Sequence, residues 1–238
     1  KFIINFLFST LFFSYIAGNL ILNINIILIL ILGFSIYRID IFKIKLNLLD
    51  KLITLFFLYI LLNGIINNFY YKANAISDDY TILLKSFLFL RFLLLYFLIN
   101  FLIKKDILNL KIFFISASIS VIFVCLDIFY QFYSGYDIFG YKGVERRLSG
   151  PFGDEWVAGS FIFRFGVISF FLYPVFYKIK NQKLLYFCLF SLFILMFLSL
   201  ILSGNRTPLF LFLISLSCII FFEKKLRKFF LAFVAIVL

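Results

Sequence analysis

Apolar stretches of membrane-spanning length follow one another along almost the whole sequence, separated by short breaks that carry Lys and Arg. A helix needs about 20 mainly apolar residues to cross the hydrocarbon core of a bilayer. The sequence therefore predicts an all-α fold, a polytopic transmembrane helix bundle of about nine spans. The expected helices cover residues 2–18, 20–37, 48–67, 81–103, 107–131, 156–177, 184–202 and 208–222, with another beginning near 229.

The composition excludes a water-soluble globule, because 65% of the residues are hydrophobic and only 14% are charged. A net charge of +12 would indicate nucleic acid in a soluble protein. Here the basic residues lie in short breaks between spans, where they report orientation, so no nucleic-acid partner is expected. Histidine is absent, and the three cysteines lie in apolar runs without metal-ligand spacing. No metal site and no cofactor are expected.

Alternate breaks differ in their basic residues, and this difference sets the expected topology. Four breaks hold fourteen of the 23 basic residues, and the alternate breaks hold five. The fourteen are Arg38, Lys43, Lys45, Lys51, Lys104, Lys105, Lys111, Lys178, Lys180, Lys183, Lys224, Lys225, Arg227 and Lys228. Because basic loops stay inside, the N-terminus is expected in the cytoplasm, with the breaks near 18–19, 68–80, 132–155 and 203–207 outside.

The longest outward break contains a polar island, Glu145–Trp156, between long apolar runs. In it, Arg146 and Arg147 precede a Ser-Gly-Pro turn at 149–151. Guanidinium groups bind phosphate oxygens through paired donors, and Gly-Pro turns bring backbone N–H groups close to the same anion. We expect these arginines to bind an anionic substrate group.

An ordinary interfacial loop is the alternative for the same island. In that case its arginines would pair with Glu145, Asp154 and Glu155. The two later carboxylates, together with Trp156, also suit the start of the next helix, with negative charge at the positive end of the helix dipole and Trp at the interface. For Asp154, Glu155 and Trp156 we favour this structural interpretation.

A second outward turn, Ser203–Pro208, places Arg206 beside the start of the helix expected from 208. A helix N-terminus beside an arginine is suited to an anion. Alternatively, Asn205 or Thr207 caps the helix and Arg206 extends to the lipid headgroups. The turn is thus a second candidate anion site.

Charged residues also occur inside the expected spans. At about 1.5 Å per residue, Arg91 and Arg164 would lie roughly 12–15 Å below the outer boundary, so a bound anion is expected for them. Asp127 and Gln131 are spaced i, i+4 and are predicted to share one helix face. Asp127 lies at a depth similar to Lys85, and a structural ion pair between them is expected.

No internal repeat and no Gly-, Pro- or Ser-rich linker divides the sequence, which is treated as a single transmembrane domain over residues 1–238. Its last apolar run, 229–238, is shorter than a span. We therefore interpret the sequence as a C-terminally truncated fragment of a longer protein.

Several short motifs together resemble the O-antigen ligase and O-antigen polymerase superfamily. They are Asp127–Gln131, Gly135–Gly140, Arg147–Glu155 and Ala158–Ser160, followed two spans later by Ser203–Thr207, which is similar to the family's second arginine motif. The resemblance covers about residues 80–215. Order, spacing and a shared outer location make the combination more specific than any motif alone.

The resemblance implies a glycosyltransferase of the bacterial inner membrane, of the integral-membrane glycosyltransferase C type. Such an enzyme takes a glycan from undecaprenyl pyrophosphate at the periplasmic face and passes it to a lipid A core or to a lipid-linked acceptor. The resemblance favours a ligase over a polymerase. By position it assigns Arg147 and Arg206 to the pyrophosphate. Family ligases carry a functional histidine in a large periplasmic loop further along, so the general base is expected beyond residue 238.

Two other functions remain open at this stage. A flippase or exporter of lipid-linked oligosaccharide would also need cations for a pyrophosphate, but the repeats and broken spans typical of transporters are not evident. An ion-coupled transporter built on Asp127 and Arg91 would carry acidic residues near the bilayer midplane, where this sequence has none.

Overall fold

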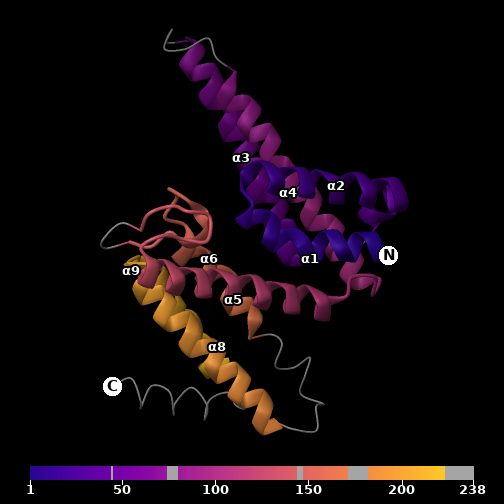
Figure 1. Cartoon of the computed structure of the whole chain (residues 1–238). Coiled ribbons are helices and arrows are strands. Elements are labelled where there is room, and N and C mark those ends of the chain that lie inside the picture. Colours follow the sequence, from indigo (N-terminus) through magenta and orange to yellow (C-terminus); the bar gives the residue numbers. More distant parts are fainter. Residues whose placement is uncertain (44, 74–79, 144–146, 171–181, 223–238) are drawn as a thin grey trace. The chain divides into compact units, whose positions relative to one another are not determined.

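The structure is a computed structural model that describes residues 1–43, 45–73, 80–143, 147–170 and 182–222. These residues form helices and one isolated antiparallel bridge, Tyr136 to Lys142 (Figure 1). The helices are α1 (Phe2–Ile16), α2 (Asn19–Tyr37), η1 (Arg38–Lys43), α3 (Leu48–Ala73), α4 (Thr81–Lys104), α5 (Leu110–Ser134), η2 (Gly150–Phe152), α6 (Ala158–Ser169), α8 (Gln182–Leu202) and α9 (Arg206–Phe222). The prediction of an all-helical chain is thus confirmed for this part of the sequence.

Four of these helical segments are long and apolar enough to cross a membrane: Asn19–Lys43, Leu48–Tyr70, Thr81–Lys104 and Leu110–Ser134. Large apolar side chains are exposed along them, such as Phe56 on α3 and Phe87 on α4, as is suited to contact with lipid. The chain is therefore assigned to the membrane. Nine spans stay a prediction, and the helix expected near 229 lies outside the described residues.

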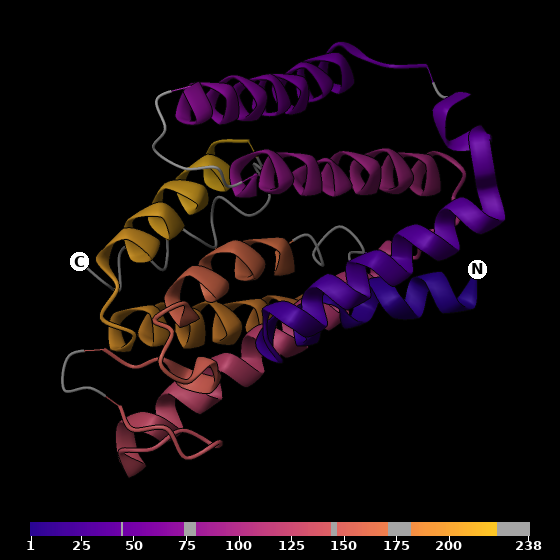
Figure 2. The same ribbon diagram turned by 90° about the horizontal axis from the view of Figure 1, so that it is seen from above.

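The chain forms two compact units, and its treatment as one domain stays a prediction. The first unit comprises residues 1–7 and 23–109, and α3 and α4 lie side by side within it (Figures 1 and 2). A polar cluster joins this pair, because the buried carboxylate of Asp50 accepts hydrogen bonds from Tyr96 Oη at 2.5 Å and Asn100 Nδ2 at 3.0 Å. Further along the pair, Gly64 packs directly on the side chain of Ser86. A small residue here lets the two helices approach closely.

The second unit comprises residues 8–22 and the chain from Leu110 on, and its apolar core lies between α5, α6, α8 and α9. Phe193 of α8 stacks on Phe212 of α9 with 5.7 Å between the ring centroids. On the other side of the core, Phe12 of α1 meets Phe165 of α6 edge to face. Because this core is apolar and closely packed, the ends of α5, α6 and α9 are held in fixed positions for the loops that follow them.

Candidate anion-binding site

The loop after α5 folds back on itself before it reaches Arg147 (Figure 2). Asp137 N donates to Tyr141 O at 2.9 Å, and Gly143 N donates to Gly135 O at the same distance. Gly135 and Gly140 adopt positive φ angles of 79° and 91°, which side chains with a Cβ rarely tolerate. The loop is therefore a compact structure fixed by its own backbone.

Two buried polar side chains of α5 hold this loop. Asp127 Oδ1 accepts a hydrogen bond from Ile138 N at 2.9 Å. Gln131 Oε1 accepts one from Gly150 N at 2.9 Å, while its Nε2 donates to Tyr141 O at 3.3 Å. The prediction that these two side chains share a helix face is confirmed. Lys85 is exposed on α4 in the first unit, and its pairing with Asp127 stays a prediction.

Gln131 provides a test of how much this attachment contributes to stability. Gln131→Met keeps the volume but leaves the buried Gly150 N–H without its acceptor, so the free energy of unfolding should fall by about 1–3 kcal/mol. Denaturant unfolding in micelles measures this change. Tyr133→Ala, on the exposed side of the same helix, serves as the control and should leave the stability nearly unchanged. If Gln131→Met were as stable as the parent protein, the hydrogen bond from Gly150 N to Gln131 would not hold the loop in place.

Arg147 lies over the ring of Trp156, with 4.6 Å between its Cζ and the ring centroid. An aromatic face attracts a guanidinium group and leaves the edge N–H donors free for an anion. The backbone carbonyl of Trp156 accepts a hydrogen bond from Asn205 Nδ2 at 3.1 Å. Trp156 therefore connects the polar island to the turn before α9.

A glycine in α6 allows that helix to approach the turn before α9 closely. Gly159, in the first turn of α6, faces the turn between α8 and α9: a Cβ added there would lie 2.8 Å from Ser203 Oγ and 3.3 Å from Asn205 Cβ. Gly204 has a positive φ of 69°, which allows the chain to reverse between the two helices. The two glycines thus set the position from which α9 starts at Arg206.

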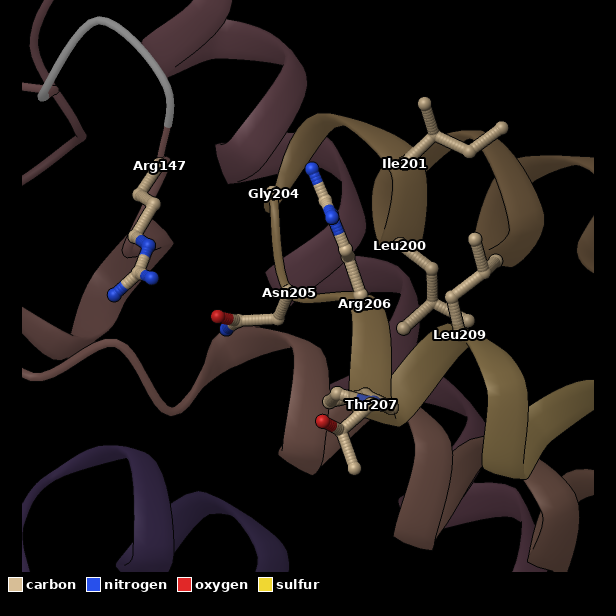
Figure 3. Close-up of a pocket in the computed structure, with 9 residues that line it drawn as sticks. Arg147, Leu200, Ile201, Gly204, Asn205, Arg206, Thr207 and Leu209 are labelled. Atoms are coloured by element: carbon tan, nitrogen blue, oxygen red, sulfur yellow. The ribbon is translucent and has the colours of Figure 1, made fainter.

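The two arginine motifs border one cavity of about 690 Å³. Its lining includes Arg147, Gly204, Asn205, Arg206, Thr207 and Leu209. Figure 3 shows Arg147 on one side of Gly204 and Asn205 and Arg206 on the other, with the two side chains pointing in opposite directions. Among the described residues that line the cavity, two are cationic and none is acidic. The start of α9, with its unpaired backbone N–H groups, adds positive potential at the same place.

The other arginines that were predicted to bind an anion are not among the described residues that line this cavity. Arg164 is exposed on α6 and is not among the residues that line this cavity. Arg91 belongs to the first unit, where its Cζ lies 4.9 Å from the ring centroid of Phe92. Its buried Nε has no hydrogen-bond partner among the described residues. Arg146 lies outside the described residues, so its role stays a prediction.

The predicted role of Asp154 and Glu155 as a cap of the next helix is wrong, whereas the interfacial position of Trp156 stays a prediction. Helix α6 begins at Ala158 with Val157 as its cap residue, no side chain caps it, and its first turn contains no acidic residue. Within the described part of the chain, neither Asp154 nor Glu155 forms an ion pair with Arg147. The backbone turns just before the helix, where Val157 N donates to Glu155 O at 2.8 Å.

Sequence reasoning missed Trp156 and Asn205 as parts of the site. Trp156 was predicted to anchor the interface, and Asn205 was named only in the alternative in which it or Thr207 caps the helix. The structure joins the two residues by a hydrogen bond from Asn205 Nδ2 to Trp156 O. The one available signal was that the single Trp of the chain stands in the same island as the two adjacent arginines.

Comparisons with known proteins find no match to this chain among family models, curated proteins or solved structures.

Proposed function

We propose that the cavity between Arg147 and Arg206 binds the pyrophosphate of a lipid-linked glycan, and that the chain is a membrane glycosyltransferase of the O-antigen ligase and polymerase type. The observation that carries this proposal is that two arginines from distant motifs line one cavity without an acidic residue in its described lining. A pyrophosphate has oxygens enough for two guanidinium groups and for backbone N–H donors. The same two arginines are those that the motif resemblance assigns to it.

In the proposed reaction, the bond between the first sugar carbon and the pyrophosphate oxygen breaks. A new bond forms between that carbon and a hydroxyl oxygen of the acceptor, whose proton passes to a general base. Negative charge grows on the departing pyrophosphate, and Arg147 and Arg206 would stabilise it more in the transition state than in the ground state. The donor is undecaprenyl-pyrophosphate glycan, and the acceptor is a lipid A core or a lipid-linked glycan. No nucleotide sugar and no metal are required by this scheme.

The proposal includes a place in the cell. The chain would be a nine-span protein of the bacterial inner membrane, with its N-terminus in the cytoplasm and the cavity at the periplasmic face. The alternation of basic breaks supports this orientation. A ligase is favoured over a polymerase by the motif resemblance.

The test uses the only Trp of the chain, because Trp156 lies under Arg147 and its fluorescence should change when the cavity fills. Purified protein in nanodiscs is titrated with undecaprenyl pyrophosphate and with undecaprenyl phosphate. We expect a saturable change with tighter binding of the pyrophosphate, since it offers a second phosphate to the second arginine. Equal binding of both lipids, or no saturable response, would overturn the proposal.

Trp156 itself gives a quantitative prediction. A cation over an exposed aromatic face contributes roughly 0.5–1 kcal/mol, so Trp156→Ala should weaken pyrophosphate binding by about two- to fivefold by releasing Arg147. Trp156→Phe retains an aromatic face and should lose less. Because these variants lack the reporter, their affinities are measured by competition with a radiolabelled lipid pyrophosphate. Identical losses for Ala and Phe would show that the ring does not position Arg147.

A further inference from the structure

A second cavity, also of about 690 Å³, borders the same polar island. It lies within the second unit, between the turn that joins α1 to α2 and the loop after α5. Its volume falls in the range of ligand pockets, about 300–1,000 Å³. The proposed function makes no use of this cavity.

The charge of this second cavity is opposite to that of the first. Asp154 and Glu155 line it, together with Asn19, and no Lys or Arg is among its described lining residues. Both carboxylates are exposed, and neither caps α6. Their oxygens are therefore free to accept hydrogen bonds from a ligand that carries hydroxyl or amide donors.

Aromatic rings supply the rest of the recognition surface. Phe139 and Tyr141 line the cavity with 61% and 47% of their surfaces exposed. The Tyr141 ring rests on the backbone at Gly153, where an added Cβ would lie 3.3 Å from the ring. Gly153 has a positive φ of 62°, a conformation that residues with a Cβ rarely adopt, so glycine suits the turn that carries Asp154 beside the ring of Tyr141. The ring and the carboxylates are held as one arrangement.

We propose that this cavity binds an uncharged sugar ring of the donor glycan, a proposal that rests on the proposed function. A sugar ring has an apolar C–H face that packs on an aromatic ring, and hydroxyl groups that donate to carboxylates. A sugar that carries its own carboxylate is repelled by Asp154 and Glu155. The cavity thereby selects against acidic sugars.

The position of the two cavities favours the donor glycan over the acceptor. Glu155 of the acidic cavity is followed directly by Trp156, on whose ring the guanidinium of Arg147 lies. Trp156 lines neither cavity, but it links Glu155 of the acidic cavity through the chain to Arg147, which lines the cationic one. In a lipid-linked glycan the first sugars are joined covalently to the pyrophosphate, and one molecule reaches both cavities.

The first arm of the test compares two sugars that differ only at C6. Methyl β-glucoside and methyl β-glucuronide are titrated against the protein in nanodiscs, with binding followed by saturation-transfer NMR. We expect the glucoside to bind at least about tenfold more tightly, which corresponds to roughly 1.4 kcal/mol. The double variant Asp154→Asn, Glu155→Gln should bring the ratio close to one. Equal or tighter binding of the glucuronide by the parent protein would overturn the proposal.

The second arm uses Tyr141 to separate donor from acceptor. Lipid pyrophosphate carrying N-acetylglucosamine should bind the parent protein more tightly than bare lipid pyrophosphate, and Tyr141→Ala should abolish that gain. Tyr141→Phe keeps the ring and should keep the gain. Absence of a gain in the parent protein, or its persistence in Tyr141→Ala, overturns the assignment. Binding of bare lipid pyrophosphate, followed by Trp156 fluorescence, should not change in the Tyr141 variants. This binding shows that the variants are folded. If the parent protein itself did not bind bare lipid pyrophosphate, the proposed function would be wrong, and not only the assignment of the second cavity.

Discussion

Arg147→Ala combined with Arg206→Ala should weaken binding of undecaprenyl pyrophosphate by at least about 100-fold. Each charge-assisted contact to phosphate is worth roughly 1.5–3 kcal/mol, and the two guanidinium groups line the same cavity. Each single variant should show a smaller loss, and Lys at either position should recover only part of it, because an ammonium group lacks the paired donors of guanidinium. Trp156 fluorescence titration measures the five variants and the parent protein.

A matched control is available in the same loop. Lys142 is an exposed cation that also lies over an aromatic ring, with 5.7 Å between Nζ and the Tyr136 centroid, but it is not among the residues that line the cavity. Lys142→Ala removes one positive charge from the loop and should leave pyrophosphate affinity nearly unchanged. If Lys142→Ala were as damaging as Arg147→Ala, the effect would be one of general surface charge, and the shared site would be refuted.

Gly159→Val should have the second largest effect, although the glycine itself offers no group to a ligand. Its Cβ would lie 2.8 Å from Ser203 Oγ, inside van der Waals contact, and a branched side chain needs more room still. The turn before α9 must then move, which breaks the hydrogen bond from Asn205 to Trp156 and separates the two arginines. We expect pyrophosphate binding to fall by about tenfold or more, at an overpacking cost of roughly 1–3 kcal/mol.

A graded series separates this positional effect from simple unfolding. Gly159→Ala adds only the Cβ and should give a smaller loss than Gly159→Val, while thermal unfolding monitors the stability of each variant. Pyrophosphate affinity should decline more than stability along the series, since the turn is displaced before the core of the second unit is disturbed. Full affinity in a folded Gly159→Val protein would show that the close packing of α6 on this turn does not position Arg206.

The helices themselves were largely predictable from the sequence. Apolar runs and basic breaks placed α2, α3, α4 and α9 within a few residues of their observed starts, because hydrophobicity and chain length act locally. The start of α6 was placed two residues early, at 156 instead of Ala158. Asp154 and Glu155 were placed at the helix start because acidic side chains suit the positive end of a helix dipole, but the first turn of α6 holds no acidic residue.

The candidate site was predictable only as two separate halves. Arg147 and Arg206 stood out because cations beside a break that is predicted to face outward are unusual enough to require a reason. Their placement around one cavity depends on the close approach of Gly159 to Ser203, on the loop held by Gln131, and on the Asn205 to Trp156 bond. Each of these contacts joins residues far apart in the chain, and no local pattern encodes them.

The sequence by itself thus determined that this protein is a helical membrane protein, and it predicted the two arginines of the candidate site, since composition, periodicity and charge placement are properties of short segments. Only the tertiary structure decided which of these arginines share a cavity and that Asp154 and Glu155 line a different one. The physical reason is that side-chain packing selects neighbours by shape. Gly159, Gly204 and the buried Gln131 fix where α9 starts relative to the polar island. This relative position determines whether Arg147 and Arg206 can bind the same ligand.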